Sequence, residues 1–161
     1  MILGISLVQF TYLHVFLSLV GIGAGIFLIF GLLTSRRLSI ITALFLTTTL
    51  FTSLTGFLFP FKGVTPGIIV GALSTLVLLL AIYALYVKQL AGVWRSVYVV
   101  SACLAFYFNF FVLIAQSFDK VPTLHAAAPT MSSPVFGVTQ IALLVIFILL
   151  TVRAVKKYNP A

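Results

Sequence analysis

The chain has 161 residues, of which 63% are hydrophobic and only 6% are charged, and its mean hydropathy is +1.33. A soluble domain is about 45–50% apolar and about 25% charged, so this composition excludes a water-soluble globular domain and predicts a protein embedded in lipid. The net charge of +8 comes from nine Lys and Arg residues and one acid. These basic residues lie in short groups between apolar runs, which is typical of membrane orientation and argues against nucleic-acid binding.

Five apolar runs follow one another, and each is long enough for the roughly 20 residues that span a bilayer. The runs are continuous and lack the alternation of a membrane barrel, so we predict helices, which satisfy every backbone amide internally. No Lys or Arg precedes Arg36, so the basic start of a cleaved signal peptide is missing and the first helix is expected to be retained. The predicted fold is an all-α polytopic membrane helix bundle, a single domain over residues 1–161, with helices at about 5–34, 38–59, 66–88, 95–118 and 135–156 and a loop at 119–134.

The basic residues predict an orientation, because five crossings place the two termini on opposite sides. Cytoplasmic loops carry the excess of Lys and Arg, which predicts a cytoplasmic C-terminus and an N-terminus outside. The loop at 119–134 is then external. One side receives Arg36, Arg37, Lys88, Arg95, Arg153, Lys156 and Lys157, whereas the other receives only Lys62 and Lys120.

Neutral polar side chains crowd toward the predicted outer leaflet. His14 shares a helix face with Gly21 and Gly25 at helical spacing, and this small-xxx-small pair allows another helix to approach closely. We expect such faces to converge, with a tight inner half and a polar outer pocket capped by the 119–134 loop. The candidate ligand-binding residues are His14, Thr52, Thr55, Asn109, Gln116, His125 and Gln140.

A purely structural interpretation competes with the functional one at each of these positions. Threonine hydroxyls in membrane helices can bond to their own backbone, which favours a structural role for Thr52 and Thr55. Asn109 is either a bond between helices or a ligand contact. His14 is either a hydrogen-bonded structural residue or a ligand, and His125 either orders its loop or binds a metal.

Several chemistries find no support in the residues present. No Asp or Glu falls within a predicted span, so carboxylate proton relays and carboxylate metal cages are not indicated. Cys103 is the single cysteine, which excludes an intrachain disulfide and a metal site built on several thiolates. No nucleophile, base and acid can be assembled into a set, so we expect no catalytic residues.

The segment that runs from Tyr107-Phe-Asn109 through Gln116-Ser-Phe-Asp-Lys-Val-Pro-Thr-Leu-His125 to Pro129-Thr130 resembles a type of small bacterial integral membrane protein. His14 and Thr55-Gly-Phe-Leu-Phe-Pro60 add to this resemblance, which covers most of the chain. The resemblance implies a multi-pass protein of the bacterial cytoplasmic (inner) membrane and implies no activity.

Three functions are compatible with this pattern. The first is a non-enzymatic bundle that binds a small apolar or lipid-like ligand, or that serves as an accessory subunit of another membrane protein. The second is an electron carrier that holds haem b through His14, with His125 or Met131 as the second axial ligand. The third is a small-solute transporter or channel whose neutral path is lined by Asn109, Gln116 and Gln140.

Overall fold

The computed structural model describes residues 2, 4–61, 63 and 65–160, and over these residues the chain is helical and contains no strand. Five helices are long and apolar enough to cross a bilayer, so the chain is a multi-pass membrane protein with an all-α bundle fold, as predicted. Lys62, one of the two basic residues assigned to the outer side, lies outside the described residues. The elements are α1 (Leu7–Leu33), α2 (Ser39–Gly56), α3 (Pro66–Ile82), η1 (Tyr83–Val87), α4 (Trp94–Lys120), α5 (Pro122–Ala127) and α6 (Pro134–Lys157).

The observed bounds follow local backbone chemistry. Ser6 and Gln9 form a capping box at the start of α1, which satisfies two of the free amides of the first turn. Pro66 and Pro134 occupy the first turns of α3 and α6, where a missing N–H costs nothing. The Thr65 side chain also accepts a hydrogen bond from the Ile68 amide. All five long helices start within two residues of the predicted positions, and three of them carry these recognisable start signals.

Three features differ from the predicted elements. The third span ends in a π-helix, in which the Lys88 amide donates to the Tyr83 carbonyl five residues earlier. The predicted loop at 119–134 contains the short helix α5, which Pro122 opens. The second helix ends at Gly56, three residues earlier than expected, because the chain from Phe57 onward turns through bonds to carbonyls three residues back.

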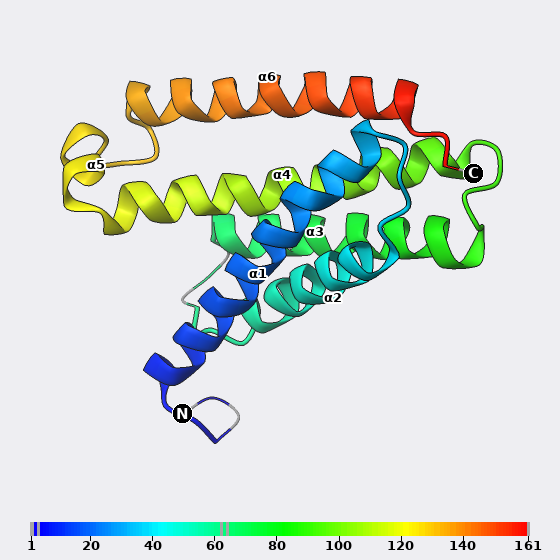
Figure 1. Ribbon diagram of the computed structural model, residues 1–161. Helices are drawn as coiled ribbons and strands as arrows, with labels where there is room; N and C mark the ends of the chain where they lie inside the picture. The colour runs from blue at the N-terminus through cyan, green and yellow to red at the C-terminus, as the bar shows by residue number, and fades with distance from the viewer. Residues whose placement is uncertain (1, 3, 62, 64, 161) are drawn as a thin grey trace.

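Helix α4 lies between α3 and α6 and runs alongside both (Figure 1). Helix α1 packs along α2 and crosses α4 and α6 near its C-terminal end. Toward its N-terminus, α1 leans away from α4 and α6 in the same view. We call the end of the bundle that holds the turns 34–38 and 88–93 and the tail 158–160 the basic end, and the end that holds α5 the loop end.

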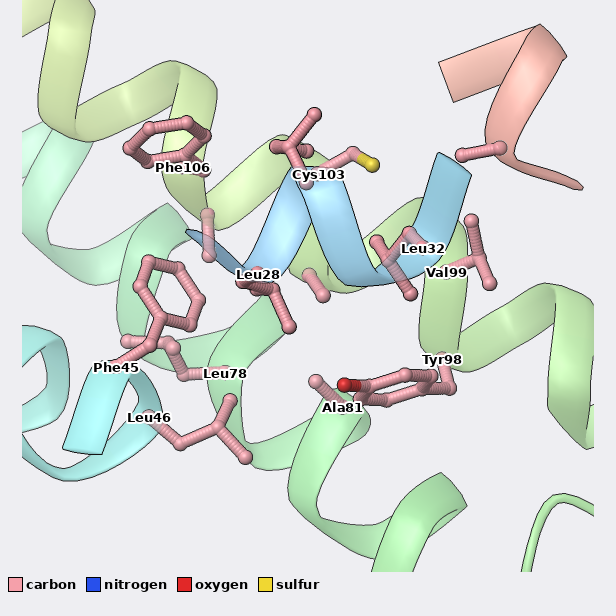
Figure 2. Packing of buried hydrophobic residues seen from close by; sticks show 14 of the residues in the cluster. Leu28, Leu32, Phe45, Leu46, Leu78, Ala81, Tyr98, Val99, Cys103 and Phe106 are labelled. Carbon is pink, nitrogen blue, oxygen red and sulfur yellow. The ribbon is translucent and has the colours of Figure 1, made fainter. Parts of the chain in front are cut away.

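The core lies in the half of the bundle near the basic end. Seven of the eight buried residues of α4 fall between Tyr98 and Phe106, and every buried residue of α1 except Phe10 lies at Gly21 or beyond. Figure 2 shows Leu28 and Leu32 of α1 in this core together with Phe45, Leu78 and Tyr98. In contrast, no residue between Thr11 and Val20 is buried. The helices therefore pack tightly at one end and open toward the other.

Candidate functional site

One interhelical hydrogen bond joins two of the interior polar side chains. The Nδ2 atom of Asn109 on α4 donates to Oγ1 of Thr49 on α2 over 3.1 Å. Thr49 is fully buried, and it has room because α1 presents a glycine: a Cβ atom at Gly21 would lie 3.0 Å from the Thr49 hydroxyl. The bond thus lies where three helices meet.

An apolar layer lies directly beneath this bond, on its basic-end side. The rings of Phe45 and Phe106 meet edge to face at a centroid distance of 5.9 Å, and Leu78 is buried in the same cluster. Figure 2 shows Phe45 of α2 between Phe106 and Leu78. Residues three or four apart on a helix share a face one turn apart, so the next turn toward the loop end places four residues at one level. We call these residues the polar layer: Gly21, Thr49, Ser74 and Asn109.

Two buried hydroxyl groups at or near the polar layer lack a hydrogen-bond partner among the described residues, namely Oγ of Ser74 and Oγ1 of Thr52. Ser74 is 4% exposed. Eleven other serine and threonine hydroxyls donate to the carbonyl four residues earlier, so this chain usually satisfies its hydroxyls locally. The hydroxyls of Ser74 and Thr52 make no such bond to their own helix. Leaving a buried polar group unpaired is unfavourable by about 1–3 kcal/mol.

His14 and Thr55, which the sequence placed in the pocket, are brought together. Nδ1 of His14 lies 2.9 Å from Oγ1 of Thr55, and the imidazole packs edge to face on Phe59. The Thr55 hydroxyl also lies within donating distance of the Phe51 carbonyl, at 2.7 Å, which leaves its lone pairs to accept from His14. This arrangement predicts the imidazole tautomer with the proton on Nδ1 and a lone pair on Nε2.

The two glutamines behave differently. Nε2 of Gln140 on α6 donates to the Phe111 carbonyl over 3.1 Å, and its Oε1 is buried without a partner in the described chain. Gln116 is exposed. It follows Asn109 by two helical turns and shares its face, but α1 has diverged from α4 at that level (Figure 1). The structure therefore does not bring Gln116 into contact with the polar layer.

His125 lies in a separate small pocket of about 60 Å³ beneath α5, which Met131 and Phe136 also line. Its Nδ1 is 3.3 Å from the Phe118 carbonyl, and Phe118 packs edge to face on Phe136 at 5.7 Å. His14 packs on α2 instead, so the structure places the two histidines in different environments. Haem ligation by His14 with His125 or Met131 gains no geometric support and stays a prediction.

A larger cavity of about 230 Å³ lies at the basic end, between the start of α2, η1 and the tail. Tight packing was predicted at this end, and none of the lining residues is among the predicted site residues. The signal in the sequence is the coincidence of Arg37 with several tyrosines near one membrane boundary, a pattern that is also typical of membrane orientation and of an aromatic belt.

Comparisons with protein-family models, with curated protein sequences and with solved structures found no match to this chain. Within the described residues, no three His, Cys, Asp or Glu side chains gather into a group that could hold a metal ion. Function is therefore argued from the polar layer and the two cavities.

Proposed function

We propose that this protein is a non-enzymatic membrane module that binds a lipid-like ligand through an uncharged hydrogen-bonding group seated at the polar layer. The single observation that carries the proposal is that the buried hydroxyls of Ser74, in the polar layer, and Thr52, one turn after Thr49 on α2, have no hydrogen-bond partner among the described residues. A ligand hydroxyl or carbonyl would supply the missing partners. The apolar remainder of the ligand would lie among the aromatic side chains of α4.

The loose packing of the loop-end half supports an entry route from the bilayer. Every α4 residue from Tyr107 to Ala115 is only partly buried. Asn109 lies within this stretch, so its amide is reachable beside α1 without unfolding the core. Ligand pockets in proteins are mostly apolar with few placed polar groups, and this half of the bundle combines both features.

The chemistry of the layer fits binding better than reaction. Its polar groups are two hydroxyls and a carboxamide, which donate and accept hydrogen bonds but do not exchange protons readily at neutral pH. The Phe45–Phe106 contact closes the basic-end side of the layer. A ligand that enters from the loop end would therefore stop at this aromatic floor.

The charge distribution supports an orientation with the loop end outside. Of the described basic residues, seven belong to the basic end and one, Lys120, belongs to the loop end, and the side richer in Lys and Arg is normally cytoplasmic. We propose that the N-terminus and α5 are external and that the polar layer faces the outer leaflet. The resemblance noted above supports a bacterial inner membrane.

The test uses the full chain in phosphatidylcholine vesicles that contain hexadecanol with a photoreactive diazirine. The comparison probe is the matching alkane without the hydroxyl. We expect the alcohol to label residues around α2 and α4 several-fold more than the alkane does, because only the alcohol offers the hydrogen-bond partner that Ser74 and Thr52 lack among the described residues.

Two substitutions on α4 sharpen this test, because each replaces an amide by an apolar side chain. Asn109→Leu should abolish the preference for the alcohol, whereas Gln116→Leu, at an exposed position, should retain it. Ser74→Ala should reduce the preference and leave the fold intact. Equal labelling by alcohol and alkane in the unmodified protein, or equal loss in both glutamine and asparagine variants, would refute the proposed site.

A further inference from the structure

The cavity at the basic end is a second site, independent of the polar layer. Tyr98 is its deepest wall at 1% exposure, and Tyr158 of the tail is 3% exposed. These two rings lie 6.0 Å apart, and in Figure 2 the Tyr98 ring lies beside Ala81 of α3. The cavity of about 230 Å³ is lined by Arg37, Ser39, Thr42, Tyr86, Tyr98 and Tyr158.

The backbone around this cavity is unusual. Among the described residues, three non-glycine residues have a positive φ, namely Ser35 at 56°, Gln89 at 49° and Leu90 at 60°, and all of them lie in the two turns of the basic end. Such conformations are strained for residues with a side chain and cluster at functional sites. The π-helix η1, another feature enriched at functional sites, supplies Tyr86 to the lining.

The tail forms one wall of the cavity, and two hydrogen bonds hold it in place. The Asn159 amide donates to Oγ of Ser35 over 2.7 Å, and Nη1 of Arg95 donates to Oδ1 of Asn159, also over 2.7 Å. These bonds tie the tail to the α1–α2 turn and to α4. They hold Tyr158 at the cavity, so Tyr158 and Arg37 line the same space.

The charged side chains described at this end are all basic. Seven basic residues lie here, and the one acidic residue of the chain, Asp119, lies at the loop end in an ion pair with Lys120. No carboxylate side chain of the described residues lines the cavity beside Arg37. The other polar side chains of the lining are hydroxyls and Gln89, all able to donate hydrogen bonds.

We propose that this cavity binds the phosphate of an anionic amphiphile. The Arg37 guanidinium binds phosphate oxygens in the bidentate manner for which its planar fork is suited, and the phenol of Tyr158 donates to the same group. The acyl chains of the amphiphile lie on the exposed apolar face of η1, where Val87 is 61% exposed. The phosphate belongs either to an acidic membrane lipid or to a soluble anion, and the experiment separates these sources.

Native mass spectrometry of the detergent-purified full chain tests the proposal. The protein is titrated with phosphatidylglycerol, with phosphatidylcholine and with inorganic phosphate in separate arms. We expect one tightly retained phosphatidylglycerol and weaker retention of phosphatidylcholine. Competition of inorganic phosphate with that lipid supports recognition of the phosphate alone, and retention of the lipid in excess phosphate supports the lipid as the occupant.

The adjacent arginines provide a matched pair of variants, because both are exposed and their substitutions change the net charge equally. Arg37 lines the cavity and Arg36 does not. Arg37→Gln should weaken phosphatidylglycerol retention about tenfold or more, since a charge-assisted hydrogen bond is lost, whereas Arg36→Gln should change it less than about twofold. Tyr158→Phe should give a smaller loss. Equal weakening in both arginine variants, or no preference over phosphatidylcholine, would overturn the proposal.

Discussion

Phe106 of α4 occupies the space that a side chain at Gly25 of α1 would need. A Cβ atom built on Gly25 would lie 2.3 Å from the Phe106 ring, a separation that real atoms do not adopt. The same ring meets Phe45 of α2 and Phe147 of α6 edge to face. One glycine therefore allows a single aromatic side chain to join four helices.

The first prediction concerns this contact. Gly25→Ala should lower the free energy of unfolding by about 1–3 kcal/mol, because the added methyl group displaces a ring that is itself tightly packed. Gly23→Ala is the matched control: nothing lies within 4 Å of its added Cβ, and alanine is the better helix former by about 1 kcal/mol. Thermal or denaturant unfolding in detergent micelles measures both variants, and equal stability of the two would contradict the packing described.

The packing of Phe106 against Gly25 also shows which features the sequence could predict. The spacing of Gly21 and Gly25 correctly indicated a close helix contact, because a helix repeats its face every three to four residues. The apolar runs likewise predicted all five spans, since bilayer thickness fixes their length. These features depend only on local pattern, which the sequence displays directly.

The remaining features depend on how the helices diverge. Gln116 was expected in the pocket from its helical register, and the register is right, but α1 no longer covers α4 at that depth. The basic-end cavity was not predicted, because Arg37 lies in a turn and Tyr158 lies in the tail. Helical periodicity does not predict which residues of turns and tails lie close together. The π-helix η1 carries no apolar pattern that differs from an α-helix.

A second prediction concerns the bond between Thr49 and Asn109. Hydrogen bonds between membrane helices contribute about 0.6 kcal/mol on average and at most about 1.7 kcal/mol. A double-mutant cycle with Thr49→Val and Asn109→Leu should therefore give a coupling energy within this range. The measurement is unfolding of the four proteins in the same detergent. A coupling energy of zero would mean that the two side chains do not interact.

A third prediction concerns the imidazole of His14. Because the Thr55 hydroxyl donates to the Phe51 carbonyl and accepts from His14, the neutral ring should be protonated at Nδ1. Nitrogen chemical shifts of histidine-labelled protein distinguish the two tautomers. Thr55→Val should remove this preference. A ring protonated at Nε2 in the unmodified protein would reverse the assigned hydrogen bond and leave Nδ1 as the free lone pair.

A fourth prediction concerns the phenol of Tyr158 in the tail. Burial raises the pKa of Tyr158, and the nearby Arg37 charge opposes that rise to a smaller degree. The folded protein therefore holds the proton more tightly than the unfolded chain does, so this group stabilises the fold below about pH 10. That contribution is lost as the pH rises further toward the folded-state pKa.

The same pair of residues provides the check on that prediction. Arg37→Gln removes the opposing charge and should raise the pKa of Tyr158 further, whereas Arg36→Gln should leave it nearly unchanged. Carbon NMR of tyrosine-labelled protein follows the titration, and Tyr158→Phe identifies the resonance. A lower Tyr158 pKa in the Arg37 variant would show that the guanidinium does not face the phenol.

A fifth prediction tests the proposed orientation through two single cysteines. Cys103 is buried, and its replacement by serine provides a background without a native thiol. In that background, Ser132→Cys places a thiol at the loop end and Gln89→Cys places one at the basic end. Both residues are exposed and lie in turns. A maleimide that cannot cross membranes should label the first in intact cells and the second only after lysis, because the end with seven basic residues is expected inside. The opposite pattern would place the polar layer near the inner leaflet and the basic-end cavity outside, and the phosphate of a cytoplasmic-leaflet lipid could then not reach Arg37.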